Sequence, residues 1–597
     1  MMRVADYVAK FIFDHGVKDV FMLSGGGIMH LTDGLACNKD LNVYCLHHEQ
    51  AVSMAIDTYA RTTGNFAAGY FTTGPGATNA LTGLAGAWLD SSPCLFISGQ
   101  SKISQCVYTA GIDGLRQIGV QEVNIVPVVQ SLTKYCVFVD DPNDMRFHLE
   151  KAFYLAKHGR PGPVWLDIPL DVQGAMIDPD KMKGFVPESE KKGIPKDDIN
   201  RVVRLIEEAK RPVILAGQGI RIAGAIPELL AFVNTYQIPI VTTFLGVDII
   251  ASNHPRYVGR IGIKGTRAGN LALQNSDFLL IIGTSLPIAE MGYDCTEFAR
   301  EAKKIAVDIE ATSYQRDSIS LDLFIQGDAK VFLQNLCDEL PSSTSTNKAW
   351  LEHCIAWREK YPVCLPQYGE LKNKINLYYF IDHLSRRLDS TDAVVTDAGS
   401  SFFAGSQGIL IKEGMRYVTS GGFASMGFGI PASIGVCVAR GKRRVMCITG
   451  DGSFQQNIQE LQSVVHHKLP IKIFVINNNG YLSIRYTQSR YFKRFIGEGP
   501  TSGVTFPETG KIAKAYGIKF FKADNNAELD HILDATISYK GPVICEIVTP
   551  PRQLIIPTVA SSKKEDGTMV SRPLEDMFPF LNRKEFKKNM IIKPLDE

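Results

Sequence analysis

The pattern of hydrophobic and polar positions alternates between two periods along most of the chain. In the N-terminal part, short apolar runs are separated by stretches with the 3.6-residue period of amphipathic helices. Examples of the apolar runs are VFMLS (20–24), FAAGYF (66–71) and VWLDIP (164–169). Strands alternating with helices are typical of a parallel sheet covered by helices on both faces.

Two further blocks have the same pattern, and polar, proline-containing segments separate the blocks. Their apolar runs include PVILAG (212–217), FLLIIG (278–283), AVVTDAG (393–399), VMCITGDG (445–452) and IKIFVINNN (471–479). We therefore predict an α/β fold with three consecutive doubly wound parallel-sheet domains, at 1–172, 196–340 and 375–550. A polar tail at 551–597 follows them.

Composition narrows the class of protein. The 64 Lys and Arg residues and 62 Asp and Glu residues leave a net charge of +2, without the basic clustering that nucleic-acid binding requires. The 12 cysteines have no zinc or disulfide spacing, and no apolar stretch reaches the length of a membrane span. An amphipathic N-terminus with early acids does not resemble a targeting signal. We expect a cytoplasmic protein with no nucleic-acid or membrane partner.

One acidic residue stands between two glycines at the end of a predicted strand. Asp451 lies in Gly450-Asp451-Gly452, and Asn478 follows the next predicted strand, 27 residues later. Consecutive strands of a parallel sheet end at the same edge, where ligands bind. Oxygen ligands there suit Mg²⁺, and the glycines would let a diphosphate approach the backbone. The alternative is a tight turn in which Asp451 caps the following helix.

The segment GDGSFQQNIQEL (450–461), followed by INNNGYL (476–482), resembles the motif of thiamine-diphosphate-dependent enzymes. The resemblance implies that Asp451, Asn478 and the backbone carbonyl of Gly480 hold Mg²⁺. It also implies that thiamine diphosphate contacts Gly450, Gly452 and Ser453.

The same resemblance implies a glutamate that hydrogen-bonds the aminopyrimidine ring and takes part in the proton transfer activating the cofactor. Glu49, in HEQAVSMA (48–55), directly follows an apolar run and begins a helical period. The stretch TTGPGATNA (72–80) resembles the loop that accompanies this element and adds Gly74 and Asn79 as cofactor contacts. The alternative for Glu49 is a first-turn acid favoured by the helix dipole.

The likeness extends over nearly the whole chain and is closest to the acetolactate synthases and related carboligases. It implies that Gly26 and Gln121 lie near the reacting carbon, and that Gly25 belongs to the same turn as Gly26. Met426 would bend the cofactor. Gly399 and Ser400 would contact the diphosphate or the intermediate, although Ser400 stands where the family has glutamine.

For the central domain, the resemblance allows three alternatives: bound FAD, bound ADP or no nucleotide. GIKGTRAGN (262–270) resembles a flavin-contacting stretch, with Lys264 in place of histidine. GTSLPIAEMG (283–292), however, lacks both arginines of the corresponding family stretch. We favour FAD on this likeness.

The resemblance implies a carboligase that removes CO₂ from a 2-oxo acid such as pyruvate and transfers the acyl unit to a carbonyl acceptor. It also implies a homodimer or homotetramer with sites between subunits. Ala289 replaces a carboxylate-binding arginine and Thr487 replaces a tryptophan, so we favour an acceptor without a carboxylate, such as a keto-sugar. Arg485 could substitute for the lost arginine, or be an exposed structural residue.

Three alternatives remain at this point. The chain could be an authentic acetolactate synthase that joins two pyruvates, a 2-oxo acid decarboxylase or a non-catalytic paralogue. We also expect that the segment SRPLEDMFPFLNRKEF (571–586) folds back and helps to cover the active-site mouth, because its composition is unlike that of a disordered end. The alternative is docking for stability only.

Overall fold

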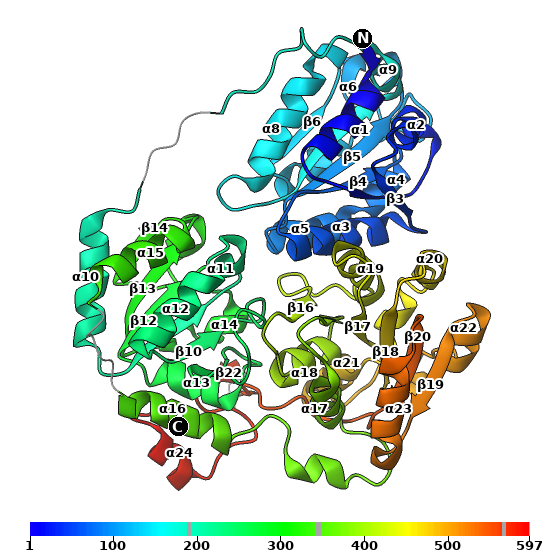
Figure 1. The fold of residues 1–597 in the computed structure, drawn as a ribbon. Coiled ribbons are helices and arrows are strands. Elements are labelled where there is room, and N and C mark those ends of the chain that lie inside the picture. The colour runs from blue at the N-terminus through cyan, green and yellow to red at the C-terminus, as the bar shows by residue number, and fades with distance from the viewer. Residues whose placement is uncertain (188–192, 342–347, 564–568, 596–597) are drawn as a thin grey trace. The chain divides into compact units, whose positions relative to one another are not determined.

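A computed structural model describes residues 1–187, 193–341, 348–563 and 569–595 (Figure 1). Three six-stranded sheets flanked by helices confirm the predicted α/β class. The chain divides into two compact units, neither of which is continuous in sequence. The first unit comprises Met1–Ser189, Asp392–Ser401 and Val418–Pro551, and the second comprises Glu190–Thr391, Phe402–Tyr417 and Arg552–Glu597.

The N-terminal sheet of the first unit is parallel throughout, with the order β3-β2-β4-β5-β7-β6. Its strands are β2 (Asp19–Met22), β3 (Asn42–Cys45), β4 (Ala67–Phe71), β5 (Cys94–Gln100), β6 (Tyr135–Phe138) and β7 (Val164–Pro169). The principal helices are α1 (Val4–Asp14), α2 (Met29–Cys37), α3 (Glu49–Thr63), α5 (Leu81–Leu89) and α8 (Met145–Lys157). The central strands β4, β5 and β7 are buried along their whole length, as expected for a sheet covered on both faces.

The C-terminal sheet has the order β16-β15-β17-β18-β20-β19, and the pairings from β15 to β19 are parallel. Its strands are β15 (Ala393–Thr396), β16 (Arg416–Thr419), β17 (Val445–Gly450), β18 (Ile471–Asn477), β19 (Lys519–Ala523) and β20 (Val543–Val548). Its principal helices are α18 (Ser400–Gly408), α19 (Gly429–Ala439), α20 (Glu460–His466), α21 (Leu482–Thr487), α22 (Thr509–Ala515) and α23 (Asn526–Ser538). Because β17 and β18 are neighbouring parallel strands, the loops after both lie at one edge of the sheet.

Helices α3 and α19 pack against each other and join the two sheets of the first unit (Figure 1). The contact is close because glycine faces it: a Cβ on Gly435 would lie 2.2 Å from the carbonyl oxygen of Ala55. The hydroxyl of Thr58 donates a 3.0 Å hydrogen bond to the carbonyl of Ala432 across the contact. Nearly all of α3 is therefore buried, including the polar residues Ser53 and Asp57.

The second unit contains the central sheet, which is parallel with the order β11-β10-β9-β12-β13-β14. Its strands are β9 (Pro212–Ala216), β10 (Ile240–Thr242), β11 (Tyr257–Arg260), β12 (Phe278–Ile282), β13 (Lys303–Asp308) and β14 (Leu323–Gln326). Its principal helices are α10 (Lys196–Glu208), α12 (Ile226–Tyr236), α13 (Arg267–Gln274), α15 (Ala329–Glu339), α16 (Lys348–Lys360) and α17 (Leu377–Arg387).

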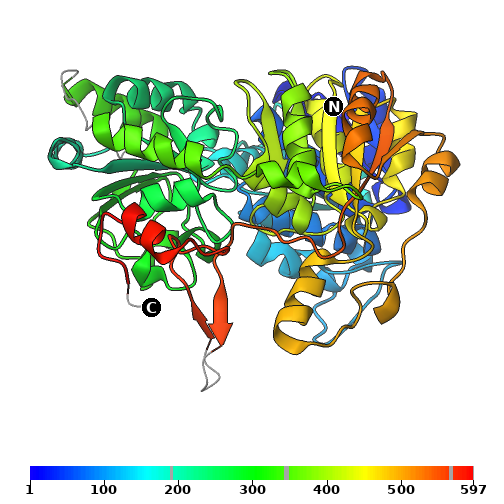
Figure 2. The same ribbon diagram turned by 90° about the horizontal axis from the view of Figure 1, so that it is seen from below.

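The tail from Arg552 belongs to this second unit and folds back onto the central domain (Figure 2). It contains an antiparallel hairpin of β21 (Ser561–Lys563) and β22 (Met569–Ser571), followed by α24 (Arg583–Asn589). The guanidinium of Arg267 donates hydrogen bonds to the carbonyls of Met577 and Pro579, and Leu574 is buried against the domain. The tail is thus docked as part of the central core. Its expected role as a cover for the active site stays a prediction.

Among the described helices, none is both long and apolar enough to cross a membrane.

Candidate active site

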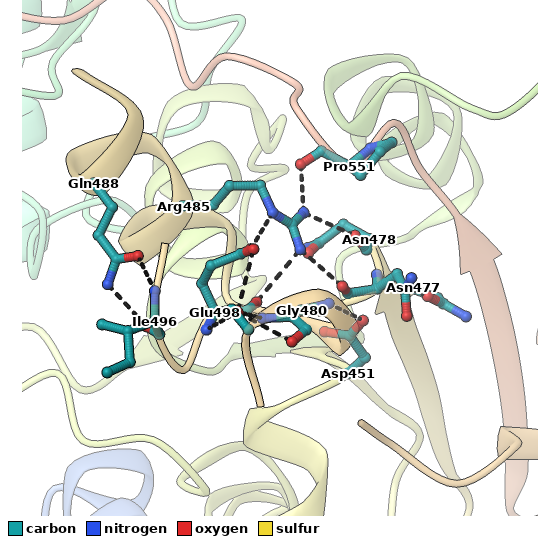
Figure 3. Close-up of polar contacts among 12 residues, drawn as sticks. Asp451, Asn477, Asn478, Gly480, Arg485, Gln488, Ile496, Glu498 and Pro551 are labelled. Carbon is teal, nitrogen blue, oxygen red and sulfur yellow. Dashed lines mark hydrogen bonds and ion pairs between the residues drawn. The ribbon is translucent and has the colours of Figure 1, made fainter. Parts of the chain in front are cut away.

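Asp451 is held at the end of β17 by two backbone N–H groups. Gly452 donates a 3.0 Å hydrogen bond to Oδ1. Gly480, from the loop after β18, donates a 3.1 Å hydrogen bond to Oδ2 (Figure 3). Burial raises the pKa of the Asp451 carboxyl to about 6, although these hydrogen bonds act in the opposite direction. A buried carboxylate with no cationic side chain among these partners is suited to a bound cation.

Asn478 follows β18 at the same edge of the sheet, and its side-chain oxygen has no hydrogen-bond partner among the described residues. Its side chain is buried, and its Oδ1 atom forms no hydrogen bond in the described structure. Buried amide oxygens are rarely left unpaired, because desolvation without a partner is costly. A Mg²⁺ ion between Asp451 and Asn478 would satisfy this atom, so the residues present fit the metal that the resemblance implies.

The loop after β18 turns sharply to bring these groups together. Asn479 and Gly480 have φ values of 59° and 144°, and a Cβ on Gly480 would lie 2.1 Å from the carbonyl oxygen of Glu498. Only glycine fits the second position. Gly450, by contrast, has open space beside its backbone, and Ser453 begins a short 3₁₀ helix that follows. The described residues contain no cluster of three His, Cys, Asp or Glu that could hold a metal. A cation here would therefore be held by one carboxylate, an amide and backbone.

The neighbouring strand β15 brings a second buried acid to this edge of the sheet. Asp397 accepts hydrogen bonds from the N–H groups of Ala398 and Gly429, at 2.7 and 2.9 Å, and burial raises the pKa of its carboxyl. Gly399, with φ of 69°, follows it, and Ser400 is the buried first residue of α18. A Cβ on Gly399 would be 3.6 Å from the hydroxyl of Ser483, so this turn adjoins α21.

Glu49 is the first residue of α3 and is buried. His48 caps the helix by accepting a 3.0 Å hydrogen bond from the N–H of Gln50, and Glu49 accepts a 3.0 Å hydrogen bond from the side-chain amide of Asn79. A Cβ on Gly76 would lie 3.2 Å from Oε1 of Glu49. Two of the residues selected from the sequence, Glu49 and Asn79, are therefore in direct contact.

The remaining N-terminal residues gather in two turns at the carboxyl ends of β2 and β4. Gly25 is pressed against the side chain of Thr72, whereas Gly26 has open space beside it. Gly74 has φ of 63°, and a Cβ there would lie 1.9 Å from the carbonyl oxygen of Gln121. Gln121 itself is exposed, with φ of 60°. The turn at Gly74 thus lies directly against the backbone of the loop that carries Gln121.

Two residues that sequence reasoning passed over connect these N-terminal residues to the metal motif. Glu460 accepts hydrogen bonds of 3.0 and 3.2 Å from the N–H of His47, and the side chain of Asn457 donates 3.0 Å to that of Gln50. The two contacts flank Glu49 in the chain. The only signal in the sequence was their place in the quoted motif, since Asn457 lies in a turn and Glu460 begins α20.

Asn457 also donates a 2.8 Å hydrogen bond to the carbonyl of Gly427, next to Met426. The Met426 sulfur itself lies 3.7 Å from the side-chain nitrogen of Gln456. Residues 456–460, which follow Asp451 in the chain, therefore contact both the loop that carries Met426 and the start of α3.

The burial of Arg485 differs from what the sequence analysis expected of a structural arginine. This side chain is buried rather than exposed, and its guanidinium donates to the carbonyls of Asn478, Asn479 and Pro551, at 3.1, 2.8 and 2.5 Å (Figure 3). Its Nε also donates to the carboxylate of Glu498. The expectation of an exposed residue was wrong because the chain after α21 returns to cover this side chain.

Comparisons with known proteins agree with this geometry. Models of the thiamine pyrophosphate enzymes match residues 2–127 as the N-terminal TPP binding domain, 199–336 as the central domain and 397–547 as the C-terminal TPP binding domain. The acetolactate synthase large subunit of Porphyra purpurea is 31% identical over 567 residues, which cover 92% of both chains. The chain belongs to the thiamine pyrophosphate enzyme family.

Other relatives support the same assignment. Acetolactate synthase isozyme 2 large subunit of Escherichia coli (strain K12) is 30% identical over 558 residues, covering 94% of this chain and 97% of the relative. The chloroplastic acetolactate synthase of Arabidopsis thaliana is 30% identical over 572 residues, covering 93% and 83%. The protein is thus a thiamine-diphosphate-dependent, acetolactate-synthase-like enzyme that acts on 2-oxo acids.

Proposed function

We propose that this enzyme is a Mg²⁺-dependent carboligase that decarboxylates a pyruvate-like 2-oxo acid and joins the acyl unit to a carbonyl acceptor without a carboxylate. The bond between the carboxyl and the keto carbon breaks and CO₂ leaves. A new carbon–carbon bond forms to the acceptor carbonyl, whose oxygen takes a proton and becomes a hydroxyl. When bound, thiamine diphosphate supplies the carbanion chemistry of this exchange.

The chain's own residues would divide the remaining work. Asp451, the amide oxygen of Asn478 and the carbonyl of Gly480 would hold Mg²⁺ against the diphosphate. Glu49 would exchange a proton with the aminopyrimidine ring from its buried position at the start of α3. Asn79, which donates to Glu49 at 3.0 Å, would keep that carboxylate oriented.

The proposal about the acceptor depends on the burial and hydrogen bonding of Arg485. A second 2-oxo acid would need a cation for its carboxylate, preferably an arginine able to form two hydrogen bonds. Ala289 stands where the family has such an arginine, and Arg485 was the residue that could have replaced it. Because Arg485 is buried and bound to Glu498 and three carbonyls, it is not available for that role. A ketone or aldehyde without a carboxylate, such as a keto-sugar, fits this site better.

The relatives favour a second candidate, because those compared here are all acetolactate synthases. A pyruvate-only assay with saturating thiamine diphosphate and Mg²⁺ separates the candidates. We expect only a trace of acetolactate, and a large increase in C–C bond formation when a keto-sugar is added. Acetolactate formed at roughly 1–10³ s⁻¹, the ordinary range of enzymes, would contradict the proposal. Product released as free aldehyde despite added acceptors would instead identify a decarboxylase.

We also propose a homodimer or homotetramer with active sites between subunits. Apolar side chains are exposed on two segments of the first unit, which supports burial against a second copy. They are Tyr108, Ile112, Ile118, Val120, Val123 and Val128 in one segment, and Ile484, Tyr491, Phe492, Phe495 and Ile496 in the other.

Mixing two inactive variants tests this arrangement. If each site takes Glu49 from one chain and Asp451 from its partner, refolding Glu49→Gln together with Asp451→Ala restores one intact site in each mixed dimer. No recovery of activity would show that both residues serve the same site from a single chain.

FAD in the central domain stays a prediction of the sequence. Three polar side chains of the Gly262–Asn270 stretch donate hydrogen bonds to the chain's own tail: Lys264 to the carbonyl of Ile555, Arg267 to that of Pro579 and Asn270 to that of Leu574. The absorption spectrum of the purified protein near 450 nm decides whether a flavin is present.

A further inference from the structure

The loop proposed to bind Mg²⁺ rests on a buried ion pair that neither the motif nor the proposed chemistry includes. The partners are Arg485, on α21, and Glu498, which lies 13 positions later; their side chains are 10% and 7% exposed. Removing two charges from water is costly, and such a pair persists where further hydrogen bonds satisfy its remaining atoms. Here those hydrogen bonds go to the metal loop itself.

The guanidinium of Arg485 holds the loop through its backbone carbonyls. One terminal nitrogen donates to the carbonyls of Asn478 and Pro551, and the other donates to that of Asn479 (Figure 3). Asn478 and Asn479 directly precede Gly480, whose carbonyl is a proposed metal ligand. A lysine could supply the charge at this position but not the planar set of donors.

Glu498 closes the other side of the same loop. Its backbone carbonyl accepts a 2.8 Å hydrogen bond from the N–H of Tyr481, the residue after Gly480. A Cβ on Gly480 would lie 2.1 Å from that carbonyl oxygen and 2.3 Å from Nη2 of Arg485, so the pair is in contact with Gly480. The ion pair therefore restrains the residues on both sides of the proposed ligand carbonyl.

The ion pair also joins the two ends of the surface segment that runs from Arg485 to Glu498. Within this segment, the side chain of Gln488 forms two 2.9 Å hydrogen bonds with the N–H and carbonyl of Ile496. The chain between them begins as a π-helical turn, Gln488–Phe492, a feature frequent at functional sites. This segment, 488–496, carries the basic residues Arg490, Lys493 and Arg494.

We propose that Arg485 and Glu498 are positioning residues that hold Asn478 and Gly480 in the geometry for Mg²⁺. This inference rests on the proposed function, because it assumes that Asp451, Asn478 and Gly480 bind the metal.

The test uses the double variant Arg485→Met/Glu498→Gln, which leaves no buried charge without its partner, and the single variant Arg485→Lys. Titration of Mg²⁺ in the presence of thiamine diphosphate, followed by calorimetry, gives the metal affinity. Loss of groups that orient metal ligands typically weakens binding by about 10–100-fold, and we expect a loss of this size in the double variant and a smaller one in Arg485→Lys. Excess Mg²⁺ restores turnover. Arg490→Met is the matched control and keeps the wild-type affinity.

The outcomes separate the two proposals. If the wild type binds thiamine diphosphate with Mg²⁺ and the variants bind Mg²⁺ within about threefold of it while melting at a lower temperature, the pair serves stability alone and the inference is overturned. Should the wild type itself show no Mg²⁺-dependent binding, the proposed function fails and the inference fails with it. If the double variant does not fold, Arg485→Lys still decides the question by its metal affinity.

Discussion

The backbone N–H of Gly480 donates a 3.1 Å hydrogen bond to Oδ2 of Asp451, across the loops that follow two neighbouring parallel strands. The contact fixes one carboxylate oxygen and places the backbone of Gly480 beside it. The amide oxygen of Asn478, which has no hydrogen-bond partner among the described residues, would offer a bound cation a further oxygen ligand. Two strands and one glycine thus assemble a candidate cation site without a second acidic side chain.

Replacing Asp451 by alanine should abolish retention of thiamine diphosphate. Without this carboxylate, Mg²⁺ loses its charged ligand and the diphosphate is left without a bridging cation. Calorimetric titration of the cofactor in Mg²⁺ buffer measures the effect, with Asp524→Ala as an exposed control. An unchanged cofactor affinity in Asp451→Ala would exclude the residue from the metal site.

Glu49→Gln should preserve the fold and cofactor binding yet lower turnover by about 10²–10⁴, which is the usual contribution of a positioned proton-transfer group. Glutamine retains an oxygen that can accept the hydrogen bond from Asn79, so the structural role of the side chain is kept. The matched control is Glu528→Gln, which changes another first-turn acid on an exposed helix. Steady-state kinetics at saturating cofactor give the result; turnover within a few-fold of the wild type would remove Glu49 from the mechanism.

The docked tail should contribute to the stability of the central domain. Leu574 is 2% exposed and packs into the central core, so Leu574→Ala should cost about 2–5 kcal/mol of unfolding free energy, as other buried leucines do. Urea denaturation followed by circular dichroism measures this loss. Leu595→Ala, at an exposed position of the same tail, should change little. Equal, small effects of both variants would mean that the tail is only loosely attached.

Glu290 should make stability depend on pH near neutrality. Burial raises the pKa of its carboxyl from 4.5 to about 7, although Thr284 donates a hydrogen bond to it. Because the folded state holds this proton more tightly than the unfolded chain, its contribution to stability falls as pH rises from about 4.5 to about 7. The whole effect is about 3 kcal/mol.

Glu290→Gln removes this titration and keeps an acceptor for Thr284. Between pH 5 and pH 8, the melting temperature of the variant should therefore rise relative to that of the wild type. Glu352→Gln, at an exposed position, should follow the wild type throughout. Parallel curves for Glu290→Gln and the wild type would contradict the prediction.

The sequence was sufficient for the fold class and for the neighbourhood of Asp451 and Asn478. Both inferences depend on local regularities: alternating apolar runs define the parallel sheets, and consecutive parallel strands end at the same edge. No knowledge of distant contacts was needed, because β17 and β18 are adjacent both in sequence and in the sheet.

The sequence did not show the connections between distant segments. Glu460 hydrogen-bonds to His47 across 413 positions, and Asn270 reaches Leu574 across 304 positions. The burial of Arg485 likewise depends on the return of Glu498 and Pro551, which no local pattern encodes. Such contacts are set by how whole elements pack, so neither the orientation of an arginine nor the docking of a tail follows from periodicity.

The close packing of α3 against α19 also has a consequence for synthesis on the ribosome. The hydrogen bond between Thr58 and Ala432 joins residues 374 positions apart, so α3 is made long before its partner. At about 5–20 residues per second, roughly 20–75 s pass between the synthesis of α3 and that of its partner. During that time, the face of α3 that includes Ala55 and Thr58 lacks the helix that covers it in the folded chain.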